Sequence, residues 1–220
     1  PVMNGAFKEL SIDSEFETHD VEPEKLEESL KKIRAGELSG IVATMPHKTP
    51  SIEFLDEITD EGRAINAVNL ILNEDGKLKG YNTDWIGAVG ALKSKVASLA
   101  GKKVLVLGAG GAARAAVFGL QKEGAEVFIW NRTPERAKEF AQKLGITWIE
   151  SLENIETPPD IIINATSVSY QPRQSTLIPF SLWKNVEVAM DAVYGKTSLF
   201  LEEAQAAQVP NIISGEIWFL

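Results

Sequence analysis

The chain has 220 residues and a formal net charge of −9, from 22 Lys and Arg against 31 Asp and Glu. That length suits one large domain or two small ones, and the acidic balance argues against non-specific binding to nucleic acid. Because cysteine is absent, disulfides, thiolate nucleophiles and cysteine-ligated metals are excluded. Only two histidines occur, which argues against a multi-histidine metal site, and no metal is expected.

The first hundred residues predict a mixture of helices and short strands. In chain order, the hydrophobic pattern predicts a helix, a strand, a hairpin and a second helix, over residues 22–35, 40–44, 67–81 and 85–98. The run 40–44 is apolar and β-rich, which is typical of a buried parallel strand. The hairpin turns at 73–76, and Asp84 is one of the polar residues that offer a cap to the second helix.

Beyond residue 100, strands and helices alternate. Five strands are predicted over 103–107, 126–130, 160–164, 186–190 and 210–213, and three helices over 112–123, 134–144 and 198–207. Such alternation builds βαβ units and a parallel sheet. We therefore expect an α/β fold with two domains, residues 1–100 and residues 101–220, that meet in or just after the helix over 85–98.

A glycine-rich turn directly follows the apolar strand and fits the form G-x-G-x-x-A. Gly108 permits the tight turn, Gly110 lets a pyrophosphate approach the backbone, and Ala113 lets the next helix lie close to the sheet. Because a strand precedes the turn and a helix follows it, dinucleotide binding is favoured over a merely structural turn. The predicted cofactor-binding residues of this turn are Gly108, Ala109, Gly110, Gly111 and Ala112.

The end of the next strand predicts which dinucleotide is bound. NAD-preferring sites usually place Asp or Glu there, whereas this chain has Asn131, Arg132 and Thr133, with Arg136 one turn on. A carboxylate repels a 2′-phosphate but a guanidinium holds it with charge-assisted hydrogen bonds, so NADP(H) is the predicted cofactor. The alternative is that both arginines are solvated residues of a helix start. Thr166, at the end of a later strand on the same edge, contacts the cofactor or caps the next segment.

Three polar clusters end predicted strands or loops of the first half, namely Thr44 with Lys48, Asn66 with Asn69, and Asn82 with Asp84. Each has an ordinary explanation, since lysines are usually solvated, Asp84 can serve as an N-cap, and a buried Asn69 needs partners but no ligand. The pattern alone does not decide whether Lys48 is catalytic.

Six short motifs occur in an order that resembles shikimate dehydrogenase. They are Thr-Met-Pro-His-Lys at 44–48, Ala-Val-Asn at 67–69, Gly-Tyr-Asn-Thr-Asp at 80–84, Gly-Ala-Gly-Gly-Ala at 108–112, Asn-Arg-Thr at 131–133 and Asn-Ala-Thr at 164–166. The resemblance covers nearly the whole chain, and it implies an N-terminal α/β substrate domain, a C-terminal Rossmann-like NADP-binding domain and an active site in the cleft between them. The implied activity is the NADPH-dependent reduction of 3-dehydroshikimate to shikimate, in the biosynthesis of chorismate and aromatic amino acids.

Carried over residue by residue, the resemblance makes Lys48 the catalytic lysine and Asp84 its partner. It also implies that Gly215 lies near the nicotinamide, and that the substrate is held by Thr44, Lys48, Asn69, Asp84 and Tyr194. These residue types suit the chemistry, because reducing a ketone requires a hydride and a proton for the developing alkoxide. A lysine beside a carboxylate can supply that proton and stabilise the negative charge.

The chain also departs from the family pattern. The family's first strand, with its Ser-x-Ser motif, would precede Pro1, and its last helix would follow Leu220. Two alternatives therefore stay open: a quinate/shikimate dehydrogenase, and a homologue that holds the nucleotide without catalysis. A glutamyl-tRNA reductase-like enzyme shares the glycine turn but needs a nucleophilic cysteine, which this chain lacks.

Residues 1–10 do not have the basic start and the apolar run of a signal peptide, and glycines and Arg114 interrupt the longest apolar region, 104–120. We therefore expect a cytoplasmic protein that binds a small-molecule substrate and neither nucleic acid nor membrane. A homodimer is left open.

Overall fold

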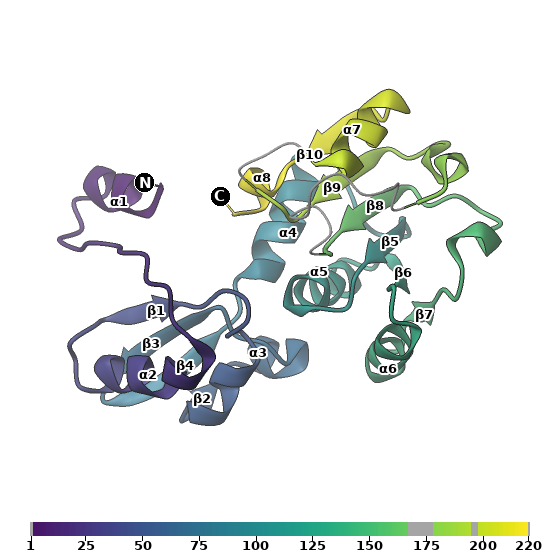
Figure 1. Cartoon of the computed structure of the whole chain (residues 1–220). Helices are drawn as coiled ribbons and strands as arrows, with labels where there is room; N and C mark the ends of the chain where they lie inside the picture. The colour runs from purple at the N-terminus through teal and green to yellow at the C-terminus, as the bar shows by residue number, and fades with distance from the viewer. Residues whose placement is uncertain (1, 167–177, 195–197, 220) are drawn as a thin grey trace.

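The computed structural model describes residues 2–166, 178–194 and 198–219. The chain forms two separate β-sheets, the first from strands within residues 40–81 and the second from strands within 103–213 (Figure 1). Helices pack against both sheets, as expected for an α/β fold. In the described part of the chain, no helix is long and apolar enough to cross a membrane.

The first sheet has four strands in the order β1-β3-β4-β2. Their bounds are Gly40–Val42 for β1, Glu57–Ile58 for β2, Leu70–Glu74 for β3 and Lys77–Tyr81 for β4. Strands β3 and β4 form the predicted hairpin, with Asp75 and Gly76 between them. The helical segments of this half are α1 (Val2–Glu9), a 3₁₀ turn at Pro23–Lys25, α2 (Leu26–Arg34), a 3₁₀ turn at Pro50–Phe54 and α3 (Asp60–Ile65). Leu26, Leu30 and Ile33 of α2 are buried in one cluster with Ile71 and Leu78 of the sheet.

The prediction that residues 40–44 form a buried parallel strand is wrong. Strand β1 pairs with β3 in the antiparallel direction and lies at the edge of the sheet, where the side chain of Val42 is 38% exposed. An apolar, β-rich run indicates a strand but does not identify its neighbour. In this sheet the hairpin after β1 supplies that neighbour, and an antiparallel edge strand can leave one face in water.

The second sheet has six parallel strands in the order β10-β9-β8-β5-β6-β7. They are β5 (Lys103–Leu107), β6 (Glu126–Trp130), β7 (Thr147–Trp148), β8 (Ile161–Asn164), β9 (Val188–Asp191) and β10 (Asn211–Ile213). The helices are α5 (Gly111–Lys122), α6 (Pro134–Leu144), α7 (Leu199–Ala206) and α8 (Gly215–Phe219), with 3₁₀ turns at Leu152–Asn154 and Phe180–Trp183. The strand order reverses between β5 and β8, and in doubly wound sheets ligands bind beside the carboxyl ends of the strands at that point. The predicted parallel sheet is confirmed.

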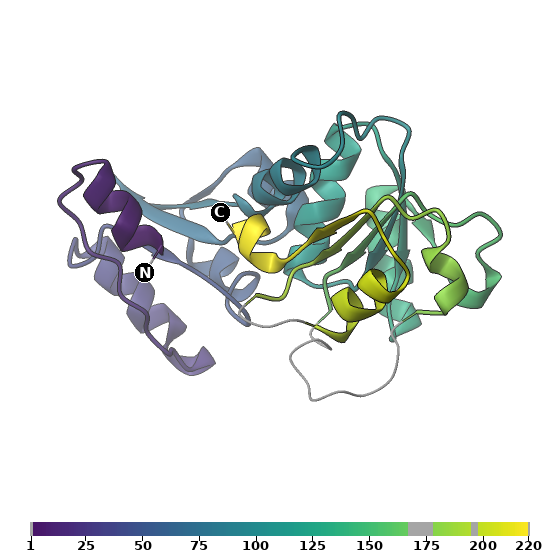
Figure 2. The ribbon, with the colours of Figure 1, turned by 90° about the horizontal axis from the view of Figure 1, so that it is seen from above.

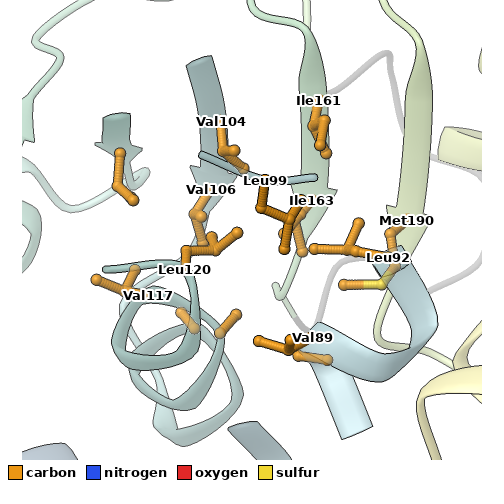
Figure 3. Packing of buried hydrophobic residues seen from close by; sticks show 14 of the residues in the cluster. Val89, Leu92, Leu99, Val104, Val106, Val117, Leu120, Ile161, Ile163 and Met190 are labelled. Carbon is orange, nitrogen blue, oxygen red and sulfur yellow. The ribbon is translucent and has the colours of Figure 1, made fainter. Parts of the chain in front are cut away.

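Helix α4 (Asp84–Lys93) follows the last strand of the first sheet and packs its apolar face into the core of the second (Figure 1). Figure 3 shows Val89 and Leu92 of α4 facing Val117 and Leu120 of α5, below side chains of β5, β8 and β9. The helix is shorter than the predicted 85–98. It ends where the hydroxyl of Ser94 donates to the carbonyl oxygen of Ala91 at 2.7 Å, a local bond that competes with further helix.

The opposite face of the second sheet buries an acidic side chain. Both carboxylate oxygens of Glu203, on α7, are buried without a hydrogen-bond partner, and burial raises the pKa of this carboxyl. The neighbouring helix residues Phe200 and Ala204 belong to the apolar cluster on this face. The charged form of Glu203 is therefore disfavoured in the folded chain.

Glu203→Gln should raise the free energy of unfolding at pH 7, and the gain should vanish when the pH falls below about 4.5. A pKa raised by folding means that the folded state holds the proton more tightly, so stability is lost as the pH rises above the pKa of the unfolded carboxyl, 4.5. Denaturant unfolding at pH 4 and pH 7 measures this, with the exposed Glu150→Gln as the control. A stability difference that does not change with pH would contradict the assignment.

Candidate active site

A lysine and an aspartate that follow two different strands of the first sheet form a close ion pair. The Nζ of Lys48 donates to Oδ2 of Asp84 at 2.6 Å, and the two side chains are 22% and 18% exposed. Lys48 lies in the loop after β1, and Asp84 begins α4 shortly after β4. Because β1 and β4 both run antiparallel to β3 between them, their carboxyl ends meet at one edge of the sheet. The topology therefore brings together the two residues predicted to be catalytic.

Asn69 holds the second oxygen of the aspartate. Its Nδ2 donates to Oδ1 of Asp84 at 2.8 Å and to the hydroxyl of Thr83 at 2.9 Å, while its Oδ1 accepts from the backbone N–H of Thr83 at 2.8 Å. Asn82 adds a further bond, since its Oδ1 accepts from the backbone N–H of Asp84 at 3.1 Å. Lys48 and Asn69 thus bind different oxygens of one carboxylate and fix its orientation.

Two other residues grouped with this site in the sequence lie at its margin. The side chain of Thr44 is exposed at the start of the turn that leads to Lys48, and its carbonyl oxygen accepts from the backbone N–H of His47 at 2.7 Å. Asn66 ends α3 in the left-handed conformation, with φ of 55°. Asn66 therefore acts as a helix cap.

The glycine-rich turn of the second sheet lies directly against the lysine. A Cβ on Gly111 would lie 3.6 Å from Cδ of Lys48 and 3.9 Å from Cβ of Ala67. Gly108 has φ of +111°, and a Cβ there would lie 2.8 Å from the carbonyl oxygen of Ala165, so the turn requires glycine. Among the described residues, no atom beyond the chain neighbours of Gly110 lies within 4 Å of its Cβ position, just before α5. This opening at a helix N-terminus fits the pyrophosphate of a dinucleotide.

The predicted phosphate-binding arginines are exposed at the end of β6 and the start of α6. Arg132 and Arg136 have no ion pair or hydrogen bond among the described residues, and their neighbour Asn131 donates from Nδ2 to the carbonyl oxygen of Thr133 at 3.0 Å. Both guanidinium groups are therefore available to an anionic ligand, which fits a nucleotide 2′-phosphate.

Arg114, which is not among the predicted site residues, lines a pocket with Arg136. The pocket measures about 300 Å³ and lies between α3, α5 and α6. The Nε of Arg114 is buried without a partner, and its guanidinium carbon lies 5.9 Å from the centre of the Phe140 ring. The pKa of Glu139 is lowered by its hydrogen bond from Lys143 and by the charge of Arg114, so the carboxylate in this pocket is ionised. The signal in the sequence is an arginine directly after the G-x-G-x-x-A turn.

The remaining candidates lie at the carboxyl edge of the second sheet. The hydroxyl of Thr166 donates to Oδ1 of Asn164 at 2.7 Å, and the segment that Thr166 could cap lies outside the described residues. Tyr194 follows β9 and is 51% exposed. Gly215 begins α8, where its backbone N–H donates to the carbonyl oxygen of Val193 at 3.1 Å.

Sequence comparisons match both halves of the chain to one family. Residues 1–71 match the shikimate dehydrogenase substrate binding domain, and residues 91–173 match shikimate / quinate 5-dehydrogenase. The shikimate dehydrogenase (NADP(+)) of Aquifex aeolicus is 37% identical over 197 residues, covering 90% of this chain and 73% of that protein. That of Pyrococcus abyssi is 39% identical over 225 residues, covering 100% of this chain and 82% of that protein.

Solved structures give the same result. The shikimate 5-dehydrogenase of Thermus thermophilus in complex with NADP(H) and shikimate aligns with a TM-score of 0.91 at 34% identity. The alignment covers 100% of this chain and 83% of that protein. A shikimate dehydrogenase from Aquifex aeolicus aligns equally well, with a TM-score of 0.91 at 34% identity over 99% of this chain and 81% of that protein.

Proposed function

This chain belongs to the shikimate dehydrogenase family, and we propose that Lys48 and Asp84 are its catalytic pair. It is an NADP-dependent oxidoreductase of a CH–OH group, and its reaction is the reversible reduction of 3-dehydroshikimate to shikimate, in the biosynthesis of chorismate and aromatic amino acids. The family has two domains, as the resemblance implied. The observation that carries the catalytic assignment is the 2.6 Å contact between Lys48 and Asp84 beside the glycine-rich turn.

Bound NADPH supplies the hydride in this reaction. Because the hydride is added to the carbonyl carbon, the carbonyl oxygen becomes an alkoxide. The residues of this chain supply the proton that this alkoxide requires. The ammonium group of Lys48 donates a proton to that oxygen, and its charge stabilises the alkoxide as it develops. Asp84 holds the ammonium in place, and Asn69 holds Asp84.

We propose that the substrate hydroxyls are held by Thr44, Lys48, Asn69, Asp84 and Tyr194. A site that pairs with each hydroxyl rejects analogues that lack one, because its own polar groups are then left unpaired. The amide of Asn69 already bonds to Asp84 and Thr83, so part of its contribution is to orient the carboxylate.

We propose that the dinucleotide lies along the glycine-rich turn and the ends of β6 and β8. Gly108, Ala109, Gly110, Gly111 and Ala112 would receive the pyrophosphate, and the 2′-phosphate would be held by Asn131, Arg132, Thr133 and Arg136. Thr166 and Gly215 would complete the site on the other side of β5. The exposed guanidinium groups and the opening at Gly110 support this placement.

We propose that the domains divide near residue 100, that the protein works in the cytoplasm and that its ligands are small molecules. A homodimer, activity on quinate and nucleotide binding without catalysis remain the alternatives to test.

Assays of shikimate and quinate, each with NADP⁺ and NAD⁺, should show the highest kcat/KM for shikimate with NADP⁺. The exposed arginines favour the phosphorylated cofactor by charge-assisted bonds. A higher kcat/KM for quinate would favour the quinate/shikimate alternative. Calorimetric binding of NADP⁺ without turnover of either substrate would favour the binding-only homologue.

A further inference from the structure

The last described helix reaches back to the catalytic aspartate. The indole Nε1 of Trp218, on α8, donates to the main-chain carbonyl oxygen of Asp84 at 2.8 Å. Trp218 is 8% exposed and belongs to the apolar cluster that includes Ala88 of α4. Figure 2 shows α8 (yellow, beside the label C) between the two sheets, and α8 packs against α4. A residue of the second half of the chain therefore holds the backbone from which the Asp84 side chain projects.

Trp218 also lies close to α4 one turn further along, at Gly87. A Cβ on Gly87 would lie 2.3 Å from the main-chain oxygen of Trp218 and 3.1 Å from Cδ1 of its ring. Only glycine allows the two helices to approach to this distance. The first turn of α4 is thus held by α8 through its backbone, while Lys48 and Asn69 hold the carboxylate of Asp84.

At its other end, α8 is fixed to the second sheet. Gly215 donates its backbone N–H to the carbonyl oxygen of Val193, just beyond β9. The carboxyl edge of this sheet is where a dinucleotide binds in doubly wound folds. Helix α8 therefore connects the cofactor edge of one sheet to the proposed catalytic pair on the other.

We propose that Trp218 is a positioning residue for catalysis. Its hydrogen bond fixes the first peptide group of α4, and with it the direction in which the Asp84 carboxylate meets Lys48. A displacement of a reacting group by about 1 Å can cost about 10²-fold in rate, so this bond bears on kcat. The inference rests on the proposed roles of Lys48 and Asp84.

Trp218→Phe is the most direct test, because it removes the N–H donor and keeps an aromatic ring in the core. Since one neutral hydrogen bond is lost, we expect kcat to fall about tenfold, with KM for NADP⁺ and the melting temperature nearly unchanged. Trp183→Phe is the matched control: Trp183 is 3% exposed, packs on Phe200 and has an Nε1 without a partner, so its variant should keep the parent kcat. An unchanged kcat for Trp218→Phe would overturn the inference, as would an equal loss for both variants.

A double-mutant cycle with Asp84→Asn tests the route of the effect. If Trp218 acts through Asp84, Trp218→Phe should cost nothing further in the Asp84→Asn background. Losses of kcat that multiply would show that Trp218 contributes only packing, and would overturn the inference. A parent-like kcat for Asp84→Asn alone would instead contradict the proposed catalytic pair.

Hydrogen exchange of the Trp218 indole N–H in the parent protein adds a check independent of the variants. Slow exchange is expected, and exchange as fast as in the unfolded chain would also overturn the proposal.

Discussion

Replacing Lys48 with alanine will lower kcat for shikimate oxidation by about 10²- to 10⁴-fold, the usual contribution of a positioned general acid or base. Lys48 is the proposed proton donor in reduction and the proton acceptor in oxidation, so both directions should slow alike. The 2.6 Å contact with Asp84 and the proximity of Gly111 place its ammonium at the meeting point of the two sheets. Steady-state kinetics in both directions measures the loss.

The control for Lys48→Ala is Lys77→Ala. Lys77 also pairs with a carboxylate, Glu57 at 2.9 Å, but it is 64% exposed on the first sheet and away from the proposed site. Its variant should keep the parent kcat, because exposed ion pairs contribute little to stability and Lys77 begins β4, whereas the proposed site lies beyond the other end of that strand. Calorimetry should show that Lys48→Ala still binds NADP⁺. A Lys48→Ala protein with a kcat within threefold of the parent would contradict the catalytic role.

Arg132→Asp is expected to lower the ratio of kcat/KM with NADP⁺ to kcat/KM with NAD⁺ by about 10²-fold. A hydrogen bond to a charged group contributes about 1.5–3 kcal/mol, and a tenfold change corresponds to about 1.4 kcal/mol. The new carboxylate also repels the 2′-phosphate, and it can accept hydrogen bonds from the ribose hydroxyl of NAD. Activity with NAD⁺ should therefore hold or rise while activity with NADP⁺ falls.

Lys184→Asp is the control for this exchange, since it makes the same change of charge at an exposed residue near the amino end of β9, on the opposite edge of the sheet. The ratio should stay at the parent value in that variant. Raising the salt concentration should weaken the binding of NADP⁺ more than the binding of NAD⁺ in the parent protein. The arginines are exposed, so salt screens their attraction for the 2′-phosphate. If Arg132→Asp leaves the ratio unchanged, the 2′-phosphate is held elsewhere, and the pocket lined by Arg114 is the next place to test.

The fold of the second half of the chain can be predicted from the sequence better than that of the first half, because its signals are local. Apolar strands at regular spacing, the turn at Gly108 and the polar ends of strands all follow from short stretches of sequence. The direction of β1 does not, because residues 40–44 carry no information about the hairpin that becomes their neighbour. The sequence pattern also does not predict α1, α3 or α8. In α3, with six residues, and α8, with five, a helical period is too short to stand out.

In the candidate site, too, some features follow from short stretches of sequence and others do not. Motifs in the sequence identify Lys48, Asp84 and Asn69, whereas the hydrogen bonds that orient them depend on the assembled sheet. Trp218 lies 134 positions from the carbonyl group that it holds. Within its own segment it is an ordinary apolar residue, so its bond to Asp84 could be found only in three dimensions.

The path of α4 has a consequence for building chimeras of this family. The helix starts with Asp84 at the proposed site, and its last turn places Leu92 in the core of the second sheet. A recombination junction at residue 100 would pair α4 from one parent with α5 and α8 from another, and the tight contact of Gly87 with Trp218 would have to re-form between sequences never selected together. A junction upstream of Asp84 keeps these three helices from a single parent. In such a chimera, Asp84 and the cofactor-binding half come from one parent, and Lys48 comes from the other.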